Sequence, residues 1–429
     1  MKRCDLVVIG LGTAGAATAA RAAARGLSVI GLDARPLDRA GARWVNGIPG
    51  WSFREAGFEL PQGEELRGEK TPFHLVAGWG PHRLTLLDHD VLEVDMRLLV
   101  ARLQGLARDA GAELLQGKVR GLHDDILETD LGPIQARWVV DASGMGGAGL
   151  LQRPRATPPE ICVAAQEVRR VRDRQAVAEY FAANDAREGE TLCYSAVAGG
   201  YSIVSVHWKG DEIALLTGSV PALGLPSGRQ LLDRFASEHP WVGDVIFGGT
   251  RPIPLRLTHT RLGEGRVALV GDAACQVYAM HGSGIGAGMI AGRMVADVLA
   301  DGGTPEDYNY RWQRTWGGLL AGACVFARYS AGLRSEHLVE LMNSGLMAPA
   351  MSTAALDQRS LAPSVGNVLT LLRGVLTSPR LAVELAPMVA RIGATYALYA
   401  MFPKDPAKIA AFEARALSLL PPVGASEPR

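Results

Sequence analysis

The sequence is poor in features that mark several large classes of protein. Its five cysteines are odd in number, scattered and without C-x-x-C spacing (Cys4, Cys162, Cys193, Cys275 and Cys324). This pattern argues against a disulfide framework and against a zinc site, so we expect no metal and a reducing, cytoplasmic location. No signal peptide is evident, and no run of 18 or more apolar residues appears, so we expect no membrane-spanning helix. The segment 388–402 comes nearest, and we interpret it as a buried or interfacial helix.

An excess of charge of either sign is also absent. The 429 residues include 44 basic and 44 acidic side chains, with 48% hydrophobic residues. Such a balance gives no reason to expect a nucleic-acid partner or broad electrostatic attraction to a membrane. The length is sufficient for two or three domains.

A glycine-rich loop near the N-terminus is the first positive sign of function. Residues 6–9 form a continuous apolar run, typical of a parallel strand buried on both faces. The segment that follows, Gly10-Leu11-Gly12-Thr13-Ala14-Gly15, matches G-x-G-x-x-G. Gly10 permits a tight turn, Gly12 lets a pyrophosphate approach the backbone, and Gly15 lets the next helix pack closely. Asp33 ends the second predicted strand. A carboxylate at this position accepts a hydrogen bond from a ribose hydroxyl of a dinucleotide. This unit therefore predicts dinucleotide binding.

A second glycine-rich segment indicates FAD rather than NAD. Another buried strand, residues 266–270, ends at Gly271-Asp272, where α/β sheets place ligand-binding groups. The Asp272 carboxylate can accept hydrogen bonds from ribitol hydroxyls, which a nicotinamide cofactor lacks. The segment Gly284-Ile285-Gly286 opens the next helix, whose N-terminus favours negative charge on a reduced flavin. The two motifs together predict a flavoenzyme.

The rest of the chain predicts an α/β protein with three parts. A Rossmann-type FAD-binding domain takes residues 1–70, 88–158 and 255–303, with 38–70 rich in loops. An inserted antiparallel-sheet substrate domain takes residues 71–87 and 159–254, where short strands alternate with turns. Residues 304–423 form a helical C-terminal region, and 424–429 a frayed tail.

These motifs resemble those of glutathione-reductase-type flavoproteins with a p-hydroxybenzoate-hydroxylase-like fold, and among them the geranylgeranyl reductase family. The resemblance covers nearly the whole chain, including segments 94–97, 139–144, 271–274 and 376–379. It implies that Arg97 contacts the flavin or its pyrophosphate and that Val119 binds adenine through its backbone. It also implies an apolar, isoprenoid-like substrate, with NADPH or NADH as an option for the electron donor.

The chain departs from that family on the substrate side. The family's Pro-Cys-Gly segment is absent from residues 39–47, and its aromatic-Trp-Phe-Pro signature retains only Tyr201 in the segment 201–206. The usual Asn-Pro after the Gly-Asp motif reads Tyr278-Ala279. The cofactor side is therefore expected to be intact and the substrate side remodelled.

Alkene reduction needs a proton donor as well as a hydride, and His281 is our candidate because histidine titrates near neutrality. A hydrogen bond that stabilises the loop is the equal alternative for His281. Tyr278 and Cys275 are alternatives, although a buried filler is the expected role of Cys275. Four tryptophans are candidates to line an apolar pocket, with simple core packing as the alternative for each (Trp44, Trp51, Trp79 and Trp208).

Three functions remain open after this reading. They are an FAD-dependent reductase or dehydrogenase, a single-component flavin monooxygenase, and a non-redox or non-catalytic flavin-binding protein such as a cyclase-like enzyme. The sequence also leaves open the oligomeric state and peripheral membrane contact through the C-terminal helices.

Overall fold

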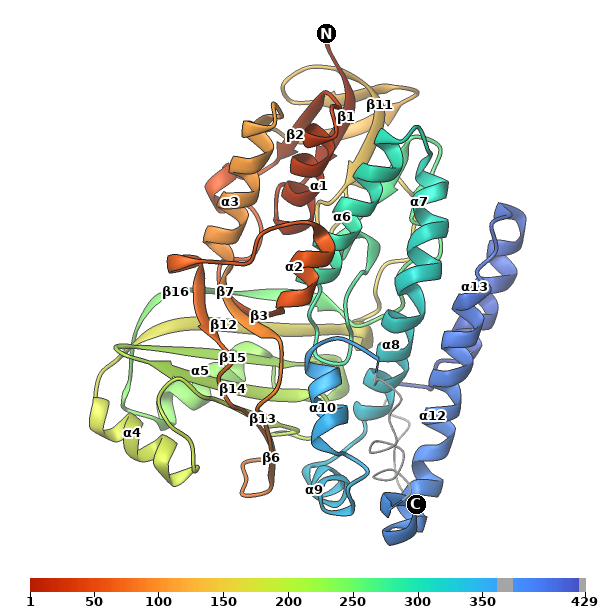
Figure 1. The fold of residues 1–429 in the computed structure, drawn as a ribbon. Helices are drawn as coiled ribbons and strands as arrows, with labels where there is room; N and C mark the ends of the chain where they lie inside the picture. Colours follow the sequence, from red (N-terminus) through yellow and green to blue (C-terminus); the bar gives the residue numbers. More distant parts are fainter. Residues whose placement is uncertain (361–372, 424–429) are drawn as a thin grey trace.

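A largely parallel sheet forms the end of the molecule that carries the N-terminus (Figure 1). The computed structural model describes residues 1–360 and 373–423, and within them this sheet runs β17-β18-β11-β1-β2-β8, with β10 paired to β11 and β9 paired to β10. Strand β1 pairs in parallel with β2 and β11, and β11 pairs with β18, so their carboxyl ends share one edge. The strands are β1 (Lys2–Ile9), β2 (Val29–Asp33), β8 (Glu113–Gln116), β9 (Val119–His123), β10 (Ile126–Thr129), β11 (Ile134–Asp141), β17 (Gly263–Glu264) and β18 (Val267–Leu269).

Two helices of this layer, α1 (Thr13–Ala24) and α6 (Ile285–Ala300), pack against each other unusually closely. A Cβ atom on Gly292 would lie 2.7 Å from Thr18 Oγ1, and one on Gly288 would lie 3.1 Å from the Ala14 side chain. Small residues are therefore required at this contact. Because α1 follows β1 and α6 follows the loop after β18, both helices begin at the carboxyl edge of the sheet. A third helix, α3 (Met96–Asp109), also packs on α1.

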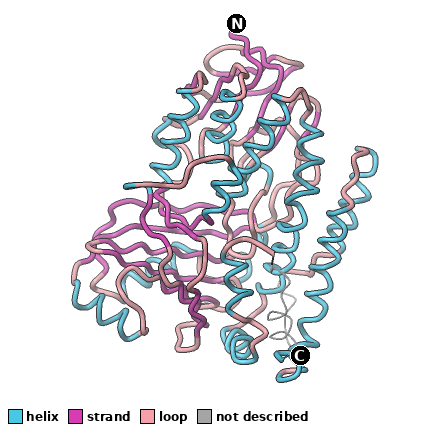
Figure 2. The backbone as a smooth tube through the Cα atoms, in the orientation of Figure 1, coloured by secondary structure: helices cyan, strands magenta, loops and turns pink. Residues whose placement is uncertain are grey.

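The second layer is a seven-stranded sheet in the order β16-β12-β15-β14-β13-β5-β6 (Figure 2). Its strands are β5 (Phe73–Ala77), β6 (Arg83–Leu86), β12 (Ile161–Val171), β13 (Thr191–Ser195), β14 (Ser202–Lys209), β15 (Glu212–Ser219) and β16 (Val242–Pro254). Helices α4 (Arg174–Ala183) and α5 (Gly228–Glu238) bury one face of it, against Val204, Val206 and Leu215. Because side chains alternate along a strand, the intervening residues face the other way.

The expectation that residues 38–70 are mainly loop is wrong in part. This segment contains β3 (Val45–Pro49), α2 (Gly50–Ala56) and β4 (Leu66–Glu69). β3 and β4 flank β7 (Val91–Asp95) in a three-stranded antiparallel sheet. Glycine, proline and charge in the segment hid these short elements, which join the two large sheets.

The C-terminal part is helical, as predicted, over the residues that the structure describes. It comprises α7 (Pro305–Trp312), a π-helical turn (Gln313–Gly317), α8 (Gly318–Ser330), α9 (Ser335–Ser344), α10 (Pro349–Leu356), α12 (Pro379–Ala400) and α13 (Ile409–Ser418). The predicted tail 424–429 lies outside the described residues.

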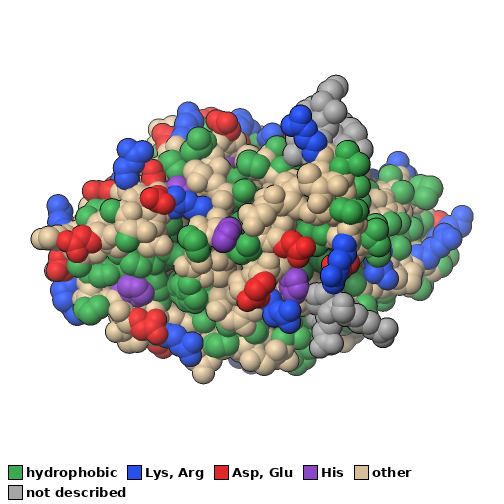
Figure 3. All heavy atoms as spheres, turned by 90° about the horizontal axis from the view of Figure 1, so that it is seen from below, with side chains coloured by type: hydrophobic (Ala, Val, Ile, Leu, Met, Phe, Trp, Pro, Cys, Tyr) green, Lys and Arg blue, Asp and Glu red, His purple; other side chains and the backbone are tan. Residues whose placement is uncertain are grey.

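Helix α12 is long and apolar enough to cross a membrane, judged by length and composition alone. It has 22 residues, with a best window of mean hydropathy 1.3, and only 11% of that window is buried. Of the two alternatives for 388–402, a buried helix does not fit most of this length, and an interfacial helix stays a prediction. In the view from below, hydrophobic side chains lie together with basic ones on the side of α12 and α13 (Figure 3).

The predicted fold class is confirmed, since a Rossmann-type layer, an antiparallel sheet and a helical C-terminal region are all present. Besides β3 and β4, two strands that matter for the site were not anticipated. β7 lies directly before α3, and β16 runs the whole length of β12 although its sequence contains three glycines and two prolines. Both strands supply residues to the candidate site.

Candidate functional site

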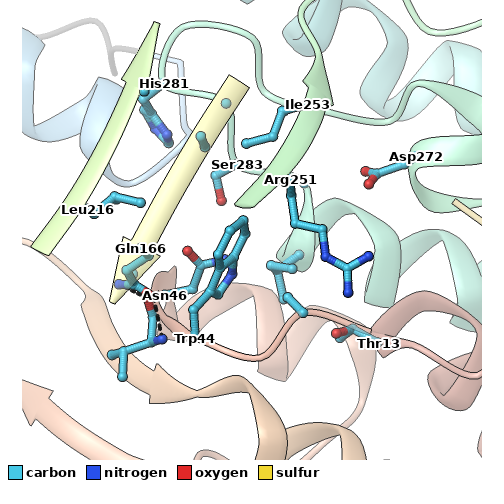
Figure 4. Close-up of a pocket in the computed structure, with 18 of the residues that line it drawn as sticks. Thr13, Trp44, Asn46, Gln166, Leu216, Arg251, Ile253, Asp272, His281 and Ser283 are labelled. Carbon is cyan, nitrogen blue, oxygen red and sulfur yellow. Dashed lines mark hydrogen bonds between the residues drawn. The ribbon is translucent and has the colours of Figure 1, made fainter. Parts of the chain in front are cut away.

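A cavity of about 670 Å³ lies where the carboxyl edge of the parallel sheet meets the exposed face of the seven-stranded sheet. It brings together residues far apart in sequence. Ten of the predicted site residues line it: Gly10, Gly12, Thr13, Ala14, Asp33, Gly271, Asp272, His281, Gly284 and Ile285. Figure 4 shows Thr13 and Asp272 on one side of this cavity, Leu216 and His281 on the other, and Trp44 between them.

The glycine loop has the geometry that a pyrophosphate requires. Gly10 has φ +87°, and a Cβ there would lie 2.5 Å from the Ala142 carbonyl oxygen. Gly12 is the N-cap of α1, and no side chain caps the helix. The first amides of α1 are consequently available to an anion, which the helix dipole also favours.

Asp33 closes the same loop from β2. One carboxylate oxygen accepts a hydrogen bond from the Leu11 amide at 2.9 Å, and the other accepts one from the Arg35 amide at 2.9 Å. The carboxylate therefore fixes the shape of the glycine loop. Each oxygen keeps a lone pair for a ribose hydroxyl, so the two roles are compatible.

Asp272 is the least satisfied acid of the cavity. Within residues 1–360 and 373–423, no donor forms a hydrogen bond to its carboxylate, and Arg251 is the charged group that acts on it. Burial raises its pKa to about 6, against the smaller, opposite effect of Arg251. A partly buried carboxylate without donors in the protein is unfavourable, and the hydroxyls of a polyhydroxylated ligand would relieve that cost.

Arg251 extends from β16 into the middle of the cavity (Figure 4). Its guanidinium donates to the Gly41 carbonyl at 2.6 Å, and burial lowers its pKa. The negative charges of Asp33 and Asp272 both act on this guanidinium. A pyrophosphate bound at the start of α1 would have the Arg251 guanidinium as its positively charged partner.

The far wall of the cavity is one face of the seven-stranded sheet. Alternate residues of four strands supply it, and most are small or apolar: Cys162, Ala164, Cys193, Ile203, Ser205, Ala214, Leu216 and Gly218. Burial raises the pKa of Cys162 to about 12 and that of Cys193 to about 11, so both remain thiols near neutrality. The wall offers room and apolar contact rather than a nucleophile.

A pair of hydrogen bonds fixes the segment that crosses the cavity. The Val45 amide donates to Gln166 Oε1 at 2.6 Å, and Gln166 Nε2 donates back to the Val45 carbonyl (Figure 4). Gln166 thus joins β3 to β12 and positions Trp44, which is 6% exposed and lines the cavity.

Trp44 is the one predicted tryptophan that lines this cavity. Trp51 stacks on Trp316 with ring centroids 5.6 Å apart, Trp79 is half exposed beside Tyr194, and Trp208 packs against Phe181. Of the four candidates, Trp44 therefore belongs to the cavity wall and the other three do not.

His281 lines the cavity, but its chemistry differs from the expectation. Its Nε2 lies 3.1 Å from the Ala355 carbonyl, and burial lowers its pKa to about 4. It is therefore neutral near pH 7, and the Nε2 hydrogen is donated to the backbone. The premise that His281 titrates near neutrality is wrong, which weakens the case for it as the proton donor. The alternatives do not replace it, since Tyr278 and Cys275 are buried beside the cavity rather than in its wall.

Four predicted cofactor residues lie outside the cavity wall. Gly15 and Gly286 serve packing, because a Cβ on Gly15 would lie 1.7 Å from the Gly10 oxygen and one on Gly286 would lie 2.7 Å from Ser52 Oγ. Arg97 forms an ion pair with Asp95 at 2.6 Å and lies over the Phe247 ring. Val119 begins β9 and pairs with Thr129. Their predicted cofactor roles stay predictions.

The sequence reading missed Arg251, Gln166, Glu93 and His207. All four line the cavity, and all project from strands of the antiparallel sheets. Alternation within β12 and β14 was a usable signal for Gln166 and His207, since both share a strand face with small residues. Nothing in the sequence of β16 distinguishes Arg251 from other arginines. The described chain holds no cluster of three or more His, Cys, Asp or Glu that fits a metal ion.

Known proteins agree with this picture over most of the chain. A family model described as lycopene cyclase protein matches residues 5–168. A digeranylgeranylglycerophospholipid reductase from Methanopyrus kandleri is 26% identical over 368 residues, which cover 78% of this chain and 88% of that protein. Another, from Sulfolobus acidocaldarius, is 22% identical over 94% of each chain.

Among solved structures, a geranylgeranyl bacteriochlorophyll reductase-like protein from Thermoplasma acidophilum has a TM-score of 0.70 at 18% identity, covering 90% of this chain and 100% of that one. A flavin-dependent brominase has a TM-score of 0.61 at 15% identity, covering 89% and 98%.

The fold is therefore one that this chain shares with a reductase-like protein and with a flavin-dependent brominase. Within it, the predicted resemblance to geranylgeranyl reductases is confirmed, because named reductases of that kind match along most of the chain.

Proposed function

We propose that the protein is an FAD-dependent reductase that saturates carbon–carbon double bonds of an isoprenoid lipid. One observation carries the proposal: a single cavity runs from the glycine loop and Asp272 to a wall of small and apolar side chains. A redox cofactor and an apolar substrate can therefore meet in one cavity. The names of the reductases similar to this chain support the substrate class.

The residues present fit FAD. The amides of α1 with Arg251 suit the pyrophosphate, Asp33 suits a ribose hydroxyl, and the donor-free Asp272 suits the ribityl chain. The uncapped N-terminus of α6 suits negative charge on a reduced ring. When bound, FAD would supply hydride transfer. The protein would hold the reactants in position, exclude water and supply protons.

The substrate wall supports an apolar substrate wider than a single straight chain. The reductase family's Trp and Phe positions hold Ile203 and Ser205 here, and both residues line the cavity. Replacing two large aromatic side chains by smaller ones widens the wall at its centre. We therefore propose a branched or polar-substituted isoprenoid as the substrate.

The experiment that tests the proposal follows bound flavin in the absence and presence of oxygen. The purified protein is reduced without oxygen by NADPH, NADH or dithionite, then mixed with prenylated lipids and quinones in a stopped-flow instrument. A reductase is reoxidised by its substrate without oxygen, and mass spectrometry finds two hydrogens added for each double bond.

A monooxygenase gives a different result, namely an oxygen-dependent transient in the flavin spectrum and no reoxidation by substrate alone. A cyclase-like enzyme changes the substrate without net change in flavin or substrate mass. Failure to bind FAD at all would contradict the central proposal.

We also propose that α12 rests on the surface of a membrane in a cytoplasmic protein. Exposed apolar residues support this, since Val383 and Val389 of α12 and the flanking Leu376 and Met401 are between 59% and 80% exposed. Flotation with liposomes tests it, with Val383→Glu as the matched variant. Equal flotation of both proteins, or of neither, would contradict the proposal.

A further inference from the structure

The apolar wall of the cavity leads from the loop before α6 to a polar far end. A Cβ atom on Gly282 of that loop would lie 3.1 Å from the Tyr201 hydroxyl, so the wall begins beside the loop at Tyr201. Ile203, Ser205 and His207 then line the cavity from alternate positions of β14. At about 3.3 Å per residue, His207 lies roughly 13 Å along the strand from Ile203. The far end is therefore well separated from the loop.

The arginines of the cavity wall lie at the cofactor end. Of the described residues that line the cavity, two are arginines, Arg35 and Arg251, and none is a lysine. Both arginines interact with Asp33, so both belong beside the glycine loop after β1. Lys209 and Arg67 lie on other strands and do not line the cavity, and the Lys209 ammonium donates to the Arg67 carbonyl. The far end thus offers an anionic group no arginine or lysine.

Glu93 is the most open polar side chain of the far end, which Glu93, Thr191 and His207 form together. Its side chain is 18% exposed, against 10% for His207, and Thr191 is 6% exposed. Gly47 pairs with Glu93 across β3 and β7, lines the cavity beside it, and has no side chain to cover it. The Glu93 carboxylate is therefore the group that a ligand at the far end meets.

Two neighbours hold this carboxylate and leave it room for a ligand. Thr191 Oγ1 lies 3.2 Å from Glu93 Oε1 and 3.1 Å from His207 Nδ1. His207 Nε2 is buried 3.2 Å from Glu93 Oε2, so the ring supports the carboxylate from behind and gives the cavity no free N–H. A carboxylate has about four lone-pair sites, so sites remain for a donor on the ligand. A neutral His207 leaves the charge of Glu93 in place, and a protonated one only cancels it.

We propose that the far end selects an isoprenoid whose polar head is a neutral hydroxyl, with Glu93 as the specificity-determining residue. The inference rests on the proposed function and deepens it. The hydroxyl donates to the Glu93 carboxylate, and the prenyl chain lies along the apolar wall toward the flavin. A phosphate monoester carries a charge of about −1.5 to −2 at pH 7 and offers mainly acceptors, so Glu93 rejects it. This chain therefore differs in substrate head from the similar proteins that are named as phospholipid reductases.

Titration calorimetry of the oxidised, FAD-loaded protein tests this selection without turnover. Three geranyl compounds serve as probes because their short chain keeps them in solution: geraniol, its methyl ether and its monophosphate. The ether lacks the hydroxyl hydrogen, and a hydrogen bond to a charged acceptor corresponds to about 10- to 150-fold in Kd. We expect geraniol to bind more tightly than the ether by that factor, and more tightly than the monophosphate by at least about 10-fold.

Three variants assign the selection to the charge of Glu93. In Glu93→Gln the preference for geraniol over the monophosphate should fall by about 10-fold or more, whereas Glu93→Asp keeps the charge and should keep the preference. Glu190 is a matched control, since it is a buried acid of the same sheet that lies 3.0 Å from His74 and does not line the cavity. Glu190→Gln should bind all three probes like the original protein. Equal binding of geraniol and the monophosphate by the original protein, or an unchanged preference in Glu93→Gln, would overturn the inference.

Anaerobic reoxidation of the reduced flavin separates this inference from the proposed function. The reduced protein is mixed with geraniol or with its monophosphate in the absence of oxygen. Equal reoxidation by the two compounds would support the reductase and overturn selection by Glu93. If geraniol binds in a way that depends on Glu93 but neither compound nor any longer prenyl alcohol reoxidises the flavin, the proposed function fails and the hydroxyl-binding site stands.

Discussion

Replacing Asp272 by Asn should make the flavin-free protein more stable above pH 6 while weakening flavin binding. Burial raises the pKa of Asp272 from 3.8 to about 6, so between these values the folded protein keeps a proton that the unfolded chain has lost. The folded state is therefore favoured below pH 4 and loses that advantage as the pH rises to 6. Asn carries no charge and escapes this loss.

The size of the effect follows from the shift. A change of about 2 pH units corresponds to about 3 kcal/mol of unfolding free energy, fully expressed above pH 6. With about 2 cal/mol/K of unfolding entropy per residue, 3 kcal/mol raises the Tm of a chain of this length by about 3 °C. Lost hydrogen bonds to a charged acceptor, at about 1.5–3 kcal/mol, should weaken FAD binding by about 10- to 150-fold.

Differential scanning calorimetry of the flavin-free proteins at pH 4 and pH 8 measures the first effect, and fluorescence titration with FAD the second. The two proteins should melt together at pH 4, and the Asn variant should melt higher at pH 8. Saturating FAD should reverse that order. Equal Tm values at pH 8, or a less stable variant, would show that Asp272 is not an uncompensated buried charge.

Three further outcomes follow from the geometry. Gly15→Ala should abolish flavin binding and lower the Tm, because the new Cβ would lie 1.7 Å from the Gly10 oxygen; absorbance at 450 nm and calorimetry check this. Gln166→Leu removes two buried hydrogen bonds to Val45 and should cost about 1–3 kcal/mol of unfolding free energy, measured in urea; a loss under 0.5 kcal/mol would mean that water replaces them. His281→Gln should keep its flavin, and its turnover should have an unchanged pH profile between pH 5 and 8, because the pKa of His281 is already about 4; a shifted profile would return His281 to the role of acid.

The cofactor half of the site could be predicted because its chemistry is local. A tight turn, a helix packed closely on a strand and an acid at the end of a strand each require a particular residue type. Gly10, Gly15 and Asp33 are those residues here. The same is true of Gly271-Asp272. The structure assembles these marks at one sheet edge.

The substrate half could not be predicted, because only the pairing between strands brings its residues together in one cavity wall. Glu93 and His207 are 114 positions apart, and nothing in either local sequence announces their 3.2 Å contact. Arg251 lies on β16, and the glycines and prolines of that segment do not suggest a strand. The charge of His281 was misjudged for a related reason, since burial and the Ala355 carbonyl set it, and neither is visible in sequence.

The parallel pairing of β11 with β18 has a consequence for how the protein is made. Val139 pairs with Val267, so about 130 residues must be translated after β11 before its partner exists. At about 5–20 residues per second, that delay lasts roughly 6–25 s. During it the nascent chain exposes an apolar strand edge open to pairing with other chains. FAD cannot find its complete site until Asp272 and α6 have emerged, so yield in cells should depend on chaperone and riboflavin supply as much as on final stability.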